Sequence, residues 1–109
     1  MKKDEIINTL QTDKQFLKDN YGVVTIALFG SYARNQANSK SDVDLYARFG
    51  RPVRLFEVLA VTHTMEDAIG LKVDLIVEEA VILHQFVRDG MAKDLIVLYE
   101  DERKEHALA

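Results

Sequence analysis

The stretch "GSYARNQANSKSDVDL", Gly30 to Leu45, joins two apolar runs of the chain. The run before it, Val23 to Phe29, is rich in β-branched residues and predicts a buried strand. The run that closes it, Asp42 to Phe49, predicts a second strand, with a short helical turn between them in "SYARNQ". A Gly-Ser pair therefore follows one strand, and two aspartates separated by a single residue open the next.

The two aspartates predict a cation site. Successive side chains of a strand alternate between its faces, so Asp42 and Asp44 point the same way, roughly 7 Å apart. Asp42 alone is typical of a turn or a helix cap. A third acid, Asp74, lies within the apolar run from Lys72 to Val77, which predicts another strand. If that strand lies beside the second one, Asp74 joins the pair.

Three carboxylates in a chain without cysteine indicate a hard-oxygen site for Mg²⁺ or Mn²⁺ rather than a zinc site. Magnesium takes few protein ligands and completes its shell with phosphate oxygens, which points to a nucleoside triphosphate. Gly30 lets the backbone approach a ligand closely, and Ser31 offers a hydroxyl and an N–H group at the first turn of a helix. Arg34 is placed to reach phosphate with its guanidinium group.

The rest of the chain predicts an α/β (α+β) fold, with a small mixed sheet flanked by helices. A helix is expected from Asp4 to Asn20, ended by Gly22, and another from Arg54 to Ile69. The second carries an apolar stripe at helical spacing: Leu55, Val58, Leu59, Thr62 and Ile69. Ala60 and Val61 fall outside that stripe. They are interpreted either as part of a surface for a partner or as residues buried more deeply in the core. A third helix over Glu79–Asp89, a last strand over Leu95–Tyr99 and a charged tail complete the expected order.

Length and charge limit the function classes. We expect 109 residues to form one domain, spanning 1–109. The net charge of −4 argues against sequence-independent binding of nucleic acid, which needs a basic face. No run is long and apolar enough for a membrane span, and the first residues lack a signal peptide's apolar core. We expect a cytoplasmic protein.

The motifs "LFGSYAR", "SDVDL" and "KVDLI" together resemble the nucleotidyltransferase superfamily with the DNA polymerase β-like fold, and within it the minimal nucleotidyltransferase (MNT) proteins. The resemblance covers nearly the whole chain. It implies that Gly30 and Ser31 grip phosphate, that Asp42 and Asp44 bind metal, and that Asp74 is the third carboxylate, acting as a base toward the incoming hydroxyl. Arg34 matches a position that is commonly basic.

The sequence departs from that pattern at Asn35, where the family usually has glycine after the arginine. This change puts the path of the loop in question. No acidic position is missing, so the resemblance still implies an active enzyme.

MNT proteins are typically paired with a HEPN partner, an RNA-cutting toxin. The resemblance implies an antitoxin that transfers AMP from ATP to a tyrosine of that toxin, with Mg²⁺ or Mn²⁺ as cofactor. Two other functions stay open: a binding module that blocks the toxin without catalysis, and a transferase acting on a small molecule.

Three further residues share the strand faces of the acids. Arg48 and Tyr46 lie on the face of Asp42 and Asp44, and Lys72 on that of Asp74. Arg48 is interpreted as a surface arginine, with phosphate contact or charge balance as the alternative.

Overall fold

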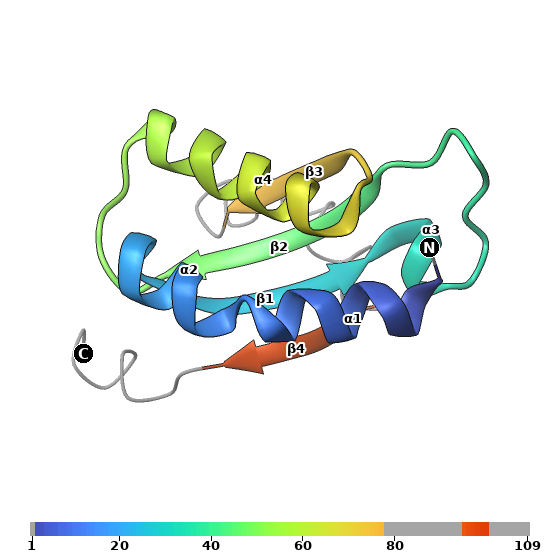
Figure 1. The fold of residues 1–109 in the computed structure, drawn as a ribbon, viewed down its shortest axis with the longest axis horizontal. Coiled ribbons are helices and arrows are strands. Elements are labelled where there is room, and N and C mark those ends of the chain that lie inside the picture. Colours follow the sequence, from blue (N-terminus) through green and yellow to red (C-terminus); the bar gives the residue numbers. More distant parts are fainter. Residues whose placement is uncertain (1, 78–94, 101–109) are drawn as a thin grey trace.

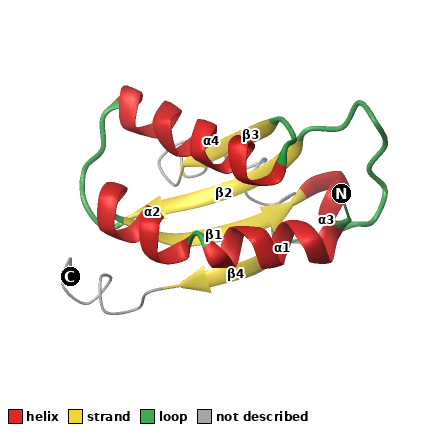
Figure 2. Cartoon of the chain, in the orientation of Figure 1, coloured by secondary structure: helices red, strands yellow, loops and turns green. Residues whose placement is uncertain are grey.

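The computed structural model describes residues 2–77 and 95–100 of the chain. Helices and strands are mixed along this part (Figures 1 and 2). The elements, in chain order, are α1 Lys3–Thr12, α2 Lys14–Tyr21, β1 Val23–Phe29, α3 Gly30–Ala33, β2 Val43–Phe49, α4 Leu55–Ile69, β3 Val73–Val77 and β4 Ile96–Glu100. The predicted helix over Glu79–Asp89 and the tail after Glu100 lie outside the described residues.

The four strands form one mixed sheet in the order β3-β2-β1-β4, which confirms the predicted fold class. Strand β1 runs antiparallel to both β2 and β4, whereas β2 and β3 run parallel. A parallel pair needs a crossover connection, and α4 supplies it. The carboxyl end of β1 and the amino ends of β2 and β3 consequently meet at one edge of the sheet (Figure 1).

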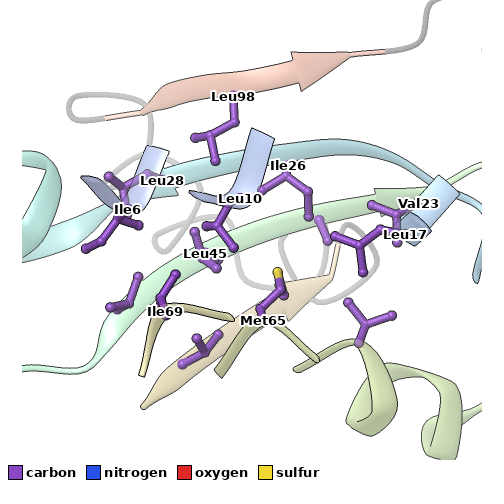
Figure 3. Close-up of a cluster of buried hydrophobic side chains, with 14 of the residues drawn as sticks. Ile6, Leu10, Leu17, Val23, Ile26, Leu28, Leu45, Met65, Ile69 and Leu98 are labelled. Atoms are coloured by element: carbon purple, nitrogen blue, oxygen red, sulfur yellow. The ribbon is translucent and has the colours of Figure 1, made fainter. Parts of the chain in front are cut away.

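Helices α1, α2 and α4 cover one face of this sheet (Figure 1). Their buried side chains meet those of the strands in a single hydrophobic cluster (Figure 3). In β2 burial alternates: Val43 and Leu45 are fully buried, while Asp44 and Tyr46 between and after them are only half-buried. The core therefore takes the odd-numbered residues at the start of β2 and leaves Asp44 on the opposite face.

The single helix predicted from Asp4 to Asn20 is two helices with a break at Asp13. The Asp13 N–H group donates to the carbonyl of Leu10, a tighter contact than a regular α-helical turn makes. The Thr12 hydroxyl bonds back to the carbonyl of Asn8, a contact that tends to bend helices. The break leaves Ile6 and Leu17 both in the core.

The apolar stripe predicted for α4 does not coincide with its core face. Leu55 and Leu59 are 75% and 50% exposed, whereas Val61 and Met65 are fully buried. Of the predicted stripe only Ile69 is buried. Val61 thus belongs to the core, which settles its two interpretations in favour of burial.

Two smaller findings concern the bounds of the last strand and the search for a membrane-spanning helix. The last strand begins at Ile96 and ends at Glu100, one residue later at each end than predicted. Among the described residues, no helix combines the length and the apolar character that crossing a membrane requires.

Candidate functional site

Gly30 forms the turn that places the candidate site at the sheet edge. The preceding residue, Phe29, pairs directly with Asp44 across β1 and β2. Gly30 itself has a φ of +76°, in the left-handed region that favours glycine. A Cβ atom added there would collide with the Asp44 carboxylate, at 2.9 Å from its Cγ. The glycine therefore serves two needs at once, a backbone conformation and the space that Asp44 fills.

The structure brings the three predicted carboxylates to the same edge. Asp44 and Asp74 are direct register partners on the parallel strands β2 and β3. Neighbouring strands lie about 4.8 Å apart, so these two acids stand side by side. Asp42 is exposed and lies just before β2, which begins at Val43 rather than at Asp42 as predicted.

Asp44 is the electrostatic centre of this group. Burial raises the pKa of its carboxyl above the ordinary value, and the charges of Asp74 and then Asp42 raise it further. Arg34 opposes them and lowers the pKa. The ionised form of Asp44 is therefore unfavourable, because burial and two neighbouring carboxylates outweigh the one nearby cation. A second cation bound at this edge would stabilise that ionised form.

A magnesium ion suits this donor set only together with a phosphate ligand. Among residues 2–77 and 95–100, no three acidic or histidine side chains stand close enough to hold a metal ion by themselves. Magnesium usually takes one or two carboxylates and fills its other positions with water and substrate phosphates. The adjacent carboxylates of Asp44 and Asp74 meet that smaller requirement.

The departure at Asn35 is accommodated by the backbone of the loop. Helix α3 ends in a Schellman motif, in which the Gln36 N–H group donates to the Ser31 carbonyl at 2.8 Å and the Asn35 N–H group to the Tyr32 carbonyl at 3.2 Å. Asn35 has a φ of 60°, the only positive value among the described residues other than glycine. Asparagine is one of the few residues that adopt this conformation readily. Asn35 thus takes the conformation that a glycine would supply.

Ser31 lies within that short helix, and Arg34 is its C-cap residue. Arg34 is exposed, and its Nε atom donates to Gln36 Oε1 at 3.0 Å. Ser31, half-buried, follows Gly30 at the start of α3. Their predicted contacts with phosphate stay predictions.

Arg48 is not the surface residue that was predicted. Its side chain is only 9% exposed, and its Nη2 atom donates to the Thr25 hydroxyl at 3.0 Å. The same atom lies 3.6 Å from Glu100 Oε2, so the arginine crosses β1 to reach β4. The three residues are register neighbours, a relation that becomes visible only once the strand order is known. Arg48 holds strands together rather than balancing the acidic site.

Two relatives of known name match most of the chain. A protein of Methanocaldococcus jannaschii, provisionally named a protein adenylyltransferase, is 39% identical over 94 residues that cover 84% of this chain and 93% of the relative. The protein adenylyltransferase MntA of Thermococcus cleftensis is 31% identical over 93 residues, covering 85% and 88% of the two chains.

Two solved structures share the fold. A toxin–antitoxin complex with AMP-PNP aligns at a TM-score of 0.67 and 19% identity, covering 92% of this chain and 79% of the other. A complex of a tri-AMPylated HEPN toxin with an MNT antitoxin, from Shewanella oneidensis, aligns at a TM-score of 0.62 and 18% identity. The alignment covers 96% of this chain and 78% of the other.

The family model described as "Polymerase beta, Nucleotidyltransferase" matches residues 11–104. That range contains the Gly30 turn and all three carboxylates. It also contains the whole of the described sheet. The chain belongs to the polymerase β nucleotidyltransferase family.

Proposed function

We propose that the chain is a magnesium-dependent protein adenylyltransferase that moves AMP from ATP to a tyrosine hydroxyl of a HEPN-type toxin. The observation that carries this proposal is the pairing of Asp44 with Asp74 at the sheet edge, against the Gly30 turn. The names of the relatives support protein adenylyl transfer, and the complex with AMP-PNP supports ATP as the substrate.

The chemistry divides among the residues of this edge. Asp44 and Asp74 would hold the metal once a triphosphate supplies its other ligands, with Asp42 nearby at the same edge; a bound Mg²⁺ would neutralise charge on the phosphates and favour departure of pyrophosphate. Gly30 and Ser31 contact the triphosphate through the turn after β1, and Arg34 offers its guanidinium group to the same phosphates. Because Asp42 and Asp74 are exposed, substrates reach them without a rearrangement of the sheet.

Asp74 is the residue placed to meet the acceptor. It takes the proton of the tyrosine hydroxyl, and the phenolate oxygen forms a bond to the α-phosphorus. The bond from the α-phosphorus to the bridging oxygen breaks, and pyrophosphate leaves with that electron pair. The products are an O-adenylylated tyrosine, pyrophosphate and a proton on Asp74, which returns to solvent.

The first experiment measures transfer of label from α-³²P-ATP to a purified HEPN protein in the presence of Mg²⁺. We expect Asp44→Asn and Asp74→Asn each to lower the rate about a thousandfold or more, because each removes a charge from the reacting centre. Asp67→Asn is the matched control, since Asp67 is an exposed acid on α4, outside the site. Full transfer by the Asp44→Asn variant would refute the proposal.

The two rival functions give different results. A binding module would protect cells from the toxin equally well after Asp42→Asn and Asp44→Asn are combined. A small-molecule transferase would label an aminoglycoside or similar acceptor and leave the protein unlabelled. Mass spectrometry of the toxin then identifies the modified residue and the number of AMP groups added.

A further inference from the structure

A hollow lies beside the start of α1, apart from the carboxylates. We call it the N-terminal depression; its volume is about 660 Å³, and its lining includes Lys2, Lys3, Tyr32, Asn35, Asn38 and Leu71. These residues come from the start of α1, from α3 and the loop after it, and from the turn between α4 and β3. In Figure 1 the start of α1 lies next to α3, at the end of the sheet where β2 begins.

The N-terminal depression and the carboxylates lie on opposite sides of one loop. Tyr32 and Leu71 belong to or pack against the core cluster on the helix-covered face. Asp44 points to the other face, because its strand neighbours Val43 and Leu45 are the buried ones. None of the three carboxylates lines the depression. A ligand bound here would therefore be distinct from a nucleotide held at the acidic edge.

The charge of the N-terminal depression is opposite to that of the chain. Of the described residues that line it, the charged ones are Lys2 and Lys3, both positive, whereas the whole chain carries −4. The nearby Glu5 does not line it; that carboxylate accepts the Lys2 N–H group at 2.9 Å and caps the helix. Two lysines in the lining of a hollow suit an anionic group, and lysine is a common phosphate ligand.

The rest of the lining suits a planar ring. Tyr32, Ala37 and Leu71 give apolar contacts, while Asn35, Asn38 and Ser39 supply amide and hydroxyl groups. Inorganic phosphate alone would leave those apolar contacts unused. The volume is in the range of about 300–1,000 Å³ that is usual for small-molecule sites. We propose that the N-terminal depression binds a nucleoside monophosphate, with the phosphate at Lys2 and Lys3 and the base against Tyr32 and Leu71.

The test uses the full chain carrying Asp44→Asn, in EDTA, so that binding at the acidic edge and turnover are both suppressed. AMP is titrated into this protein by calorimetry, and ¹H–¹⁵N spectra locate the binding. We expect saturable shifts at the amides of Asn35, Asn38 and Ser39. Replacing Lys2 and Lys3 together by alanine should weaken AMP binding at least tenfold.

Lys40→Ala is the matched control, because Lys40 is an exposed lysine of the same loop that does not line the depression. It should change the affinity for AMP less than twofold. Adenosine and inorganic phosphate, titrated separately, should each bind more weakly than AMP. Equal affinity of the double lysine variant, equal affinity for inorganic phosphate, or no saturable shift at these amides would each overturn the proposal. Because AMP binding is read directly, in EDTA and without turnover, the result does not depend on whether the chain transfers AMP.

Discussion

At the scale of single residues, the ionised carboxylate of Asp44 lowers the stability of the folded chain, although the proposed site needs it. Its pKa is raised in the folded chain above the ordinary 3.8, so the folded state holds this proton more tightly than the unfolded state. The free energy of unfolding must then fall as pH rises through the interval between the two pKa values. Below that interval the carboxyl group is protonated in both states and contributes no such difference.

Asp44→Asn should therefore stabilise the metal-free chain. At pH 7.5 in EDTA we expect a gain of up to about 1 kcal/mol, a value that allows for solvent screening of a half-buried group. At pH 3 the gain should vanish, because the wild-type carboxyl is then neutral too. Urea unfolding at both pH values measures it, with Asp67→Asn as the control. A variant equally or less stable than wild type at pH 7.5 would contradict the electrostatic picture of the site.

Gly30→Ala tests the close contact between the turn and Asp44. The added methyl group meets the carboxylate, and the backbone keeps an unfavourable φ, so we expect a loss of about 1–3 kcal/mol and at least a tenfold loss of transfer. Gly70→Ala is the control: its φ is +69°, but a Cβ atom there meets nothing within 4 Å. That variant should lose about 1 kcal/mol and keep its activity. Equal activity of the two variants would show that the contact has no functional weight.

Asn35 offers a milder test of the same loop. Asn35→Gly should change the free energy of unfolding by less than about 0.5 kcal/mol, because both residues accept a positive φ. Asn35→Val should cost about 1–2 kcal/mol, since a β-branched side chain is poorly tolerated in that conformation. Thermal unfolding of the two variants measures the difference. If valine were tolerated as well as glycine, the Schellman ending of α3 would be of little importance.

At the scale of elements, the buried face of α4 is not the apolar stripe through Leu55 and Leu59 but the face of Val61 and Met65. Met65→Ala should cost about 2–5 kcal/mol, because it empties a fully buried position. Leu59→Ala should cost less than about 1 kcal/mol, since half of that side chain is already in solvent. Urea unfolding compares them under the same conditions. A larger loss for Leu59→Ala would mean that this face is covered in solution.

The sequence located the helices and strands of the described part, but not the face that α4 buries. Helical spacing identifies a stripe, and α4 carries two candidates: one through Leu55 and Leu59, the other through Val61 and Met65. Only the packing of α4 as a crossover between β2 and β3 selects between them. The break at Asp13 also escaped prediction, because the apolar period continues across it and a backbone turn ends the helix.

The candidate site was predictable to the extent that it depends on local pattern. The Gly-Ser turn and the alternation around Asp44 are properties of adjacent residues, and both are found in the structure. The pairing of Asp44 with Asp74 was conditional on strand order, and the parallel register satisfies that condition. Burial of Arg48 was not predictable, since it depends on Thr25 and Glu100, which come from two other strands.

At the scale of the whole molecule, the hydrophobic core and the acidic residues lie on different faces of the sheet. Helices α1, α2 and α4 and the core lie against one face (Figure 1), and the acids gather at an edge of the other. Substitutions at Asp44 therefore leave the hydrophobic cluster untouched, and the global stability of the chain becomes a readout of ligand binding at that edge.

Magnesium with ATP should raise the free energy of unfolding of the wild-type chain. A ligand at a hundred times its dissociation constant stabilises the folded state by about 2.7 kcal/mol, and chelation by EDTA should remove most of that gain. Asp44→Asn should lose the gain, although the same variant is the more stable one without ligand. The order of the two proteins in a thermal unfolding assay must thus reverse between EDTA and saturating magnesium with ATP. If the variant were simply misfolded, its unfolding temperature would be lower than that of the wild type under both conditions. If the site needed no metal, EDTA would not change the stabilisation by ATP. Only an acidic centre that repels itself until a cation and a triphosphate arrive produces the reversal.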